Sequence, residues 1–248
     1  MTALSPRCSF SGTALKTIAC ITMLIDHIGA SCIEAGILTP GLDIGTLSRD
    51  TLSAYPLYRL DMVLRFTGRL AFPIFCFLLV EGFVHTRDVK KYVRRLFLFA
   101  LISEVPFDLA FFRTPFALEH QNVYWTLALG VLAMAGLKYF EKPDGSASWK
   151  GLLCAAGCTL AALLACTDYD GIGVLIICAL YLTRGDRKRQ CIVGALLFLF
   201  ELTAPLAFVL VWFYNGQRGR CTPAMQKVFY WFYPVHLSVL AVVTNLIL

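Results

Sequence analysis

The chain has 248 residues, of which 58% are hydrophobic and 15% are charged. Soluble domains carry roughly 25% charged residues, so this chain has too few polar side chains to cover a water-facing surface. The same composition excludes disordered, collagen-like and coiled-coil chains. The net charge of +6 does not indicate nucleic acid as a partner, because the basic residues form short clusters between apolar runs. The composition therefore predicts a membrane protein.

Apolar runs recur at the length of about 20 residues that a membrane-crossing helix needs. We expect spans at 15–34, 63–85, 93–112, 121–140, 151–167, 171–183 and 226–248. A further apolar region, 190–214, is interrupted at Glu201 and Pro205. It forms either one long span or two short helices, and the latter would be two passes or a re-entrant hairpin. The expected fold is an all-α, polytopic integral membrane bundle of about nine transmembrane segments, in a single domain over 1–248.

Basic links between the runs predict how the chain is oriented. The links 86–95 and 184–189 are rich in Lys and Arg, which is typical of cytoplasmic loops. The acidic loop 35–61 and the turn at Asp168 then face outward. The basic link around Arg218 is also cytoplasmic only if the interrupted apolar region 190–214 enters and leaves the membrane on the same side. We therefore expect a multi-pass protein of the plasma membrane with a cytoplasmic N-terminus and an outward C-terminus.

Several ionisable side chains lie inside the expected spans, where each costs several kcal/mol by insertion scales and so indicates function. They are Asp26, His27, Arg65, Arg69, Glu81, His85, Glu104, Asp108 and His236. A simple membrane anchor has no need of such residues.

Lys16 and His27 are eleven residues apart, so a helix places them on one face about 16 Å apart. This spacing suits a co-substrate with a phosphate head and a long arm that ends in a reactive group, such as acyl-coenzyme A. His27 is then a candidate general base, and Asp26 a candidate for orienting it. Alternatively, Lys16 extends to the membrane surface and His27 bonds a neighbouring helix.

The second expected span carries two pairs at four-residue spacing, which places each pair on one helix face. Arg65 and Arg69 can hold phosphates or pair with carboxylates, and Glu81 and His85 can relay protons. Two ligands alone do not make a metal site, so we expect no metal. Pro73 should kink this span.

Carboxylates and a basic turn complete the candidate residues. Glu104 and Asp108 lie one helical turn apart toward the outer side, where they either receive a cationic acceptor or neutralise the arginines. The Gly-interrupted turn with Arg218 and Arg220 can bind phosphate or serve as a plain cytoplasmic loop. His236 places a second imidazole inside the membrane.

Seven segments in this order resemble the TraX family over nearly the whole chain. They are Leu15-Lys16-Thr-Ile-Ala, Met23-Leu-Ile-Asp26-His27-Ile-Gly29, Gly68-Arg69-Leu-Ala-Phe-Pro-Ile-Phe75 with Glu81-Gly-Phe-Val-His85-Thr-Arg87, Ser103-Glu104-Val-Pro-Phe-Asp108, Tyr214-Asn-Gly-Gln-Arg218-Gly219 and Tyr233-Pro-Val-His236. The resemblance implies a bacterial inner-membrane acetyltransferase, because the family's named member acetylates the N-terminus of conjugative pilin. The site positions that it implies are Lys16, Asp26, His27, Arg69, Glu81, His85, Glu104, Asp108, Asn122, Arg218 and His236.

The chain is more loosely similar to transmembrane acyltransferases of the acyltransferase-3 type. These have an arginine eleven residues before a catalytic histidine on the first span. Lys16 stands in place of that arginine here, so the charge is kept but the bidentate fork of a guanidinium is not.

Residues and resemblance together predict transfer of an acetyl group from cytoplasmic acetyl-CoA to an amine or hydroxyl of a protein, glycan or lipid acceptor in or beyond the membrane. The catalytic candidates are His27, Asp26, Glu81 and His236. The candidates for binding acetyl-CoA are Lys16, Arg65, Arg69, Arg218 and Arg220. The candidates for binding the acceptor are His85, Glu104, Asp108, Asn122 and Asp168. The alternatives are a proton-coupled transporter and an assembly factor for a surface structure.

Overall fold

The computed structural model describes residues 9–38 and 57–246, and helices account for nearly all of the regular structure there. The described part contains no strand beyond two isolated bridges, Phe10 with Tyr214 and Gln121 with Thr167. The prediction of an all-α membrane bundle is therefore confirmed. Most of the loop expected at 35–61 and the end of the span expected at 226–248 lie outside the described residues.

The helices follow the predicted apolar runs in order. In chain order they are α1 (Gly12–His27), the π-helix η1 (Ile28–Leu38), α3 (Tyr58–Gly68), α4 (Ala71–His85), α5 (Val89–Phe111), α6 (Val123–Tyr139), α7 (Trp149–Leu164), α8 (Asp170–Leu182), α9 (Arg187–Leu197), the short 3₁₀ helix η3 (Ala204–Leu206), α10 (Ala207–Trp212) and α11 (Pro223–Leu246). Within the described residues, three helical units are long and apolar enough to cross a membrane: Gly12–Leu38, Tyr58–His85 and Pro223–Leu246. The helices α6, α7 and α8 are apolar but shorter.

Pro73 divides the second predicted span, but the break lies four residues before the proline. The helix α3 ends at Gly68, and α4 begins at Ala71. A proline ring clashes with the carbonyl four residues earlier, which here belongs to Arg69. Gly68 at this break lies so close to Asp26 that a Cβ would overlap the aspartate side chain. The break therefore brings α3 against α1 at the level of the candidate histidine.

The interrupted region 190–214 forms a hairpin of two short helices. Since α9 has 11 residues and α10 has six, they extend about 16 Å and 9 Å, against the roughly 30 Å of a bilayer core. The ring of Phe208 fills the space above Gly194, so the two helices pack closely. Of the predicted alternatives, the structure has two short helices rather than one long span.

The basic links meet at one end of the bundle. Arg187, at the start of α9, lies over the ring of Tyr214 with its guanidinium carbon 5.0 Å from the centroid, and it also contacts Glu81 near the end of α4 at 3.6 Å. The turn after α10 is tied to the start of α1, where Thr13 donates to the Arg218 carbonyl at 2.8 Å. The start of α9, the end of α4 and the turn after α10 therefore lie together at one end of the bundle.

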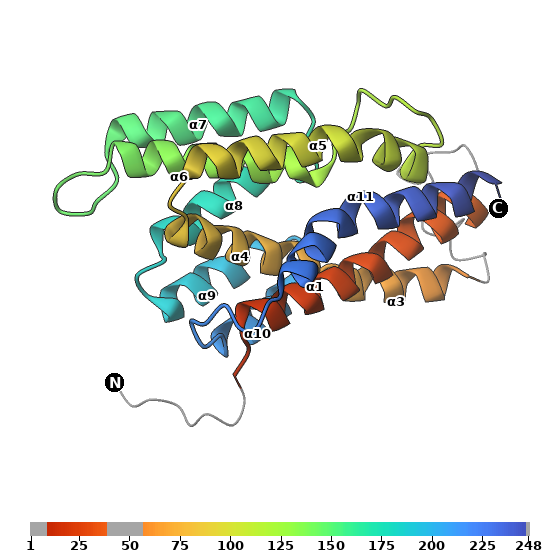
Figure 1. Cartoon of the computed structure of the whole chain (residues 1–248), viewed down its shortest axis with the longest axis horizontal. Coiled ribbons are helices and arrows are strands. Elements are labelled where there is room, and N and C mark those ends of the chain that lie inside the picture. The colour runs from red at the N-terminus through yellow and green to blue at the C-terminus, as the bar shows by residue number, and fades with distance from the viewer. Residues whose placement is uncertain (1–8, 39–56, 247–248) are drawn as a thin grey trace.

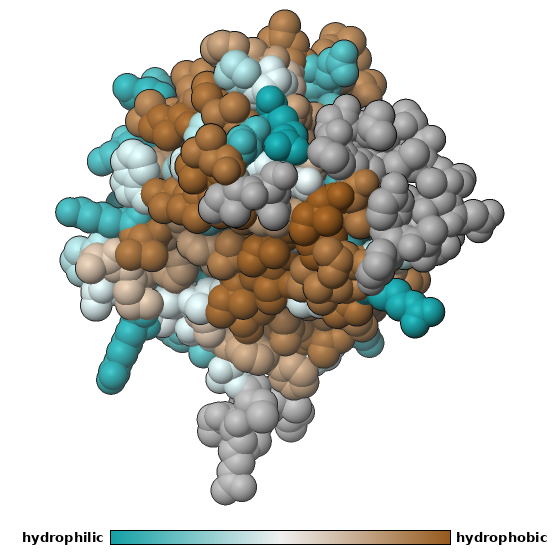
Figure 2. Space-filling model, turned by 90° about the vertical axis from the view of Figure 1, so that its right-hand side faces the viewer, coloured by the Kyte–Doolittle hydropathy of each residue, from teal (hydrophilic) through white to brown (hydrophobic). Residues whose placement is uncertain are grey.

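Two groups of apolar side chains hold the bundle together. The larger lies between α4, α6 and α8, with Phe77, Met134 and Ile177 fully buried. The smaller joins α5 to α11 through Phe107 and Leu237, and these helices run alongside each other in Figure 1. Large apolar side chains also cover much of the outer surface, and they gather over the middle of the face in Figure 2. Such a surface is typical of contact with lipid.

Candidate functional site

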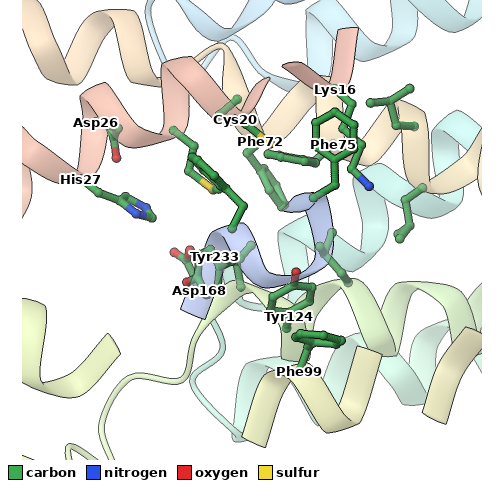
Figure 3. A pocket seen from close by; sticks show the side chains of 18 of the residues that line it. Lys16, Cys20, Asp26, His27, Phe72, Phe75, Phe99, Tyr124, Asp168 and Tyr233 are labelled. Atoms are coloured by element: carbon green, nitrogen blue, oxygen red, sulfur yellow. The ribbon is translucent and has the colours of Figure 1, made fainter. Parts of the chain in front are cut away.

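A cavity of about 1120 Å³ runs through the bundle between α1, α4, α5, α6 and α11. Lys16 and His27 both line it, as their shared helix face predicted. In Figure 3, His27, Asp168 and Tyr233 lie at one end of the view and Lys16 lies at the other, with Phe72, Phe75 and Tyr124 between them. The cavity therefore connects a basic end, an aromatic middle and a polar centre.

His27 and His236 form a hydrogen-bonded pair at the polar centre. Their Nδ1 and Nε2 atoms are 2.7 Å apart, and His236 Nδ1 lies 2.7 Å from the Phe232 carbonyl oxygen. A carbonyl only accepts, so in the neutral pair His236 Nδ1 carries a proton and His236 Nε2 accepts from His27 Nδ1. This assignment leaves His27 Nε2 with a free lone pair. The arrangement suits a general base whose charge a second imidazole helps to bear.

Asp26 points away from His27, because consecutive helical residues project about 100° apart. Its carboxylate accepts from Arg65 at 2.5 Å, and Arg65 also contacts Glu34 at 3.3 Å. His27 was predicted to be oriented by Asp26 or Glu81, but its partner in the structure is His236. Arg65, predicted to bind phosphate, is instead engaged by two carboxylates.

Arg69 likewise pairs with a carboxylate at the tip of the hairpin formed by α9 and α10. Its guanidinium lies 2.9 Å from Glu201, which also accepts from the Tyr169 hydroxyl at 3.2 Å. The Tyr169 ring stacks on Phe72 with centroids 3.6 Å apart. This cluster joins α4, the hairpin and the turn before α8 beside the polar centre, and it leaves Arg69 far less free for phosphate than predicted.

Asp168 presents its carboxylate to the cavity from the turn between α7 and α8. Three residues of this turn, Cys166, Tyr169 and Asp170, have positive φ angles of 48°, 65° and 44°, a costly conformation for residues other than glycine. Asp168 is partly exposed and lines the cavity, and desolvation within the protein raises the pKa of its carboxyl group to about 7, with a further contribution from Asp26. The turn therefore adopts a strained backbone conformation, and this conformation holds a carboxyl group at the polar centre.

Cations without a carboxylate partner among the described residues gather at the basic end. The Lys16 ammonium lies over the rings of Phe229 and Tyr230, at 4.9 Å and 5.4 Å from their centroids. The Arg95 guanidinium lies 4.5 Å from the Tyr230 centroid, and Arg218 also lines this part of the cavity. Arg220 is exposed and does not line the cavity. Lys16, Arg95 and Arg218 can therefore receive an anion.

Glu81 and His85 lie at the end of α4 beside these cations, far along the cavity from His27. Glu81 contacts Arg187, and His85 Nδ1 lies 2.8 Å from the Glu81 carbonyl oxygen. Both residues therefore lie at the basic end, away from the polar centre. The sequence had indicated Glu81 as a catalytic residue and His85 as an acceptor-binding residue.

Three predicted acceptor residues join α5 to α6 and its preceding loop, and none of them lines the cavity. Glu104 accepts from Asn122 at 2.5 Å and from Trp125 at 2.7 Å. Asn122 also donates to the Ala100 carbonyl and caps α6. Asp108 accepts from the Ala117 backbone N–H at 2.9 Å. These contacts give the three residues a role in packing.

Sequence reasoning missed Arg95, Tyr124 and Tyr233 as cavity residues. Arg95 was counted only as part of a basic link, and Tyr233 was quoted only as part of a motif. No local pattern distinguishes a cavity-facing aromatic residue from one in an interfacial belt. Among the described residues, no group of three or more His, Cys, Asp or Glu side chains is placed to hold a metal ion.

Comparison with known proteins agrees with this helical membrane architecture. The model of the TraX protein family matches residues 11–244. The chain is also 30% identical to the "probable fimbrial assembly protein FimC, serogroup H1" of Dichelobacter nodosus, over 96% of this chain and 97% of the relative. No solved structure matches the chain. Because the family match covers nearly the whole sequence, this membrane protein belongs to the TraX family.

Proposed function

We propose that the protein is an acyl-CoA-dependent acetyltransferase of the bacterial inner membrane, with its N-terminus in the cytoplasm. The observation that carries the proposal is a cavity that links cations without a carboxylate partner among the described residues, at its basic end, to a histidine with a free nitrogen lone pair at its polar centre. A phosphate-bearing donor with a long arm fits that arrangement, because its charged head and its reactive end need different surroundings.

The donor end of the proposal rests on Lys16, Arg95 and Arg218. Phosphates bind where cations are not already neutralised, and none of the three has a carboxylate partner among the described residues. Arg65 and Arg69 do not meet this condition, and Arg220 lies outside the cavity. The phosphates of coenzyme A therefore bind at the end of the cavity where the basic links meet.

The aromatic middle of the cavity suits the uncharged arm of the donor. Phe72 and Phe75 line it together with the Tyr124 ring, and such a surface binds apolar groups while excluding water. The arm bridges the distance of about 16 Å between Lys16 and His27. The thioester then lies beside the histidine pair.

At the polar centre, His27 Nε2 accepts the proton of the acceptor amine or hydroxyl. His236 accepts a hydrogen bond from His27 Nδ1, so it holds the ring in the reactive tautomer and shares the positive charge. Asp168 faces the same space and binds the incoming acceptor, which is a protein, glycan or lipid reaching the cavity from the membrane or the outer side. The relative named as a fimbrial assembly protein supports an acceptor in a surface structure.

Calorimetric titration of the detergent-purified protein with acetyl-CoA tests the proposal. We expect saturable binding that weakens in Arg218→Ala, since that variant removes a cation from the cavity wall. Arg220→Ala is the matched control, because it removes the same charge from the same turn but not from the cavity. Absence of binding to folded protein, or equal weakening in both variants, would overturn the proposal.

A further inference from the structure

Tyr233 carries a buried hydroxyl group whose proton has no acceptor among the described residues, although the backbone N–H of Val123 points toward its oxygen. Its side chain is 3% exposed and lies against the cavity. Buried tyrosine hydroxyls normally have a partner, and an unpaired one destabilises the folded protein. The O–H proton of Tyr233 thus has no acceptor in the described part of the chain, and the residue that carries it lines the cavity.

The position of Tyr233 connects this free donor to the histidine pair. Its ring centroid lies 5.9 Å from that of His27 and 5.6 Å from that of His236, and both contacts are edge-on. Tyr233 and His236 are three residues apart on α11, so they project from one face of the helix. Figure 3 shows Tyr233 with His27 and Asp168 at the polar centre. The same helix thus supplies the partner of the base and a free O–H group.

The charged donors nearby are already engaged. Arg65 binds Asp26 and Glu34, and Arg69 binds Glu201. A donor with no competing acceptor is the better oxyanion ligand, because it does not have to give up another bond when charge develops.

We propose that Tyr233 is a catalytic residue that donates a hydrogen bond to the carbonyl oxygen of the bound thioester. This inference rests on the proposed acyl transfer and adds the group that stabilises its negative charge. The acceptor lone pair forms a bond to the carbonyl carbon while His27 Nε2 takes the acceptor proton, and the carbonyl π electrons move to the oxygen that Tyr233 binds. When those electrons re-form the carbonyl, the C–S bond breaks, and the sulfur leaves with the proton from His27 as free coenzyme A.

Infrared difference spectroscopy with acetyl-CoA labelled with ¹³C at the carbonyl tests this role without a known acceptor. A hydrogen bond to the thioester oxygen lowers the carbonyl stretching frequency. We expect a lowered frequency in the native protein and in Tyr181→Phe, a buried tyrosine of α8 that does not line the cavity. In Tyr233→Phe the band should return toward its position in free acetyl-CoA. The rate of acetyl transfer should fall about 10²- to 10³-fold in this variant, as for the loss of one oxyanion donor.

Tyr233→Phe should fold nearly as well as the native protein, because the lost O–H proton has no acceptor among the described residues. Thermal unfolding checks this expectation. If acetyl-CoA binds but the band does not depend on Tyr233, the inference is wrong while the proposed function stands. A lowered band that disappears in Asp168→Asn and survives in Tyr233→Phe would transfer the role to a protonated Asp168. If acetyl-CoA does not bind at all, the proposed function itself fails.

Discussion

Polar side chains inside this membrane bundle occupy two regions that differ in whether they face the cavity. Between α5 and α6, Glu104 accepts from Asn122 and Trp125 through one carboxylate oxygen, and its other oxygen is buried without a partner, away from the cavity. Around the polar centre, His27 Nε2 has no donor and the Tyr233 O–H has no acceptor among the described residues, and both residues line the cavity. Both regions contain residues that are expensive in a membrane. The difference indicates that the energetic cost of a polar residue in a membrane does not by itself identify a functional site. A polar atom that lacks a hydrogen-bond partner at the wall of a cavity does.

Removing the proposed base should produce the largest effect on activity. In His27→Ala we expect acetyl transfer to fall about 10²- to 10⁴-fold, the range for loss of a general base. Binding of acetyl-CoA should change little, because the cations at the basic end remain. Rates of coenzyme A release and calorimetric affinities measured on the same preparation separate the two effects. Retained transfer in this variant would exclude His27 as the base.

Asn122, which lies between α5 and α6 and away from the cavity, should behave in the opposite way. Asn122→Ala removes the cap of α6 and two side-chain donor contacts of a fully buried residue. Loss of a cap costs about 1 kcal/mol, and unpaired buried groups cost about 1–3 kcal/mol, so we expect destabilisation by about 2 kcal/mol or more. Unfolding in detergent measures the loss.

The affinity of Asn122→Ala for acetyl-CoA, measured below its unfolding temperature, is the control for that experiment. It should match the native value, because Asn122 does not line the cavity. A variant that is fully stable but has lost binding would show that the boundary between the two regions is drawn in the wrong place.

Asp168 should make the folded protein less stable at neutral and higher pH, although it is a residue of the proposed site. Its pKa of about 7 in the folded protein lies above the unfolded value of about 3.9, so the folded state binds this proton more tightly. Stability is therefore lost as pH rises from about 4 to 7, and the loss persists at higher pH. We expect Asp168→Asn to raise the unfolding temperature at pH 8, with a smaller gain at pH 5. A gain that is equal at both pH values would mean that the carboxyl charge is not its cause.

The sequence predicted relations along one helix better than relations between helices. Lys16 and His27 line one cavity because their spacing is a local property of α1. The same geometry implies that Asp26 and His27 diverge, which the sequence interpretation overlooked when it paired them. The partner of His27 is 209 residues away, and nothing local to either residue indicates that contact. The packing role of Glu104 also depends on contacts with a neighbouring helix. A carboxylate of the site and a carboxylate that only joins two helices therefore look alike in the sequence.

Lys16 offers the smallest expected effect and a direct test of the basic end. Lys16→Met keeps most of the apolar stem against Phe229 and Tyr230 but removes the charge. One phosphate contact among several is worth about tenfold in affinity, or about 1.4 kcal/mol. Lys150→Met is a matched control at an exposed position outside the cavity. Because the lost interaction is ionic, the difference between the two variants should shrink as salt is raised. A difference that does not depend on salt would mean that Lys16 acts through packing with the aromatic rings rather than through phosphate.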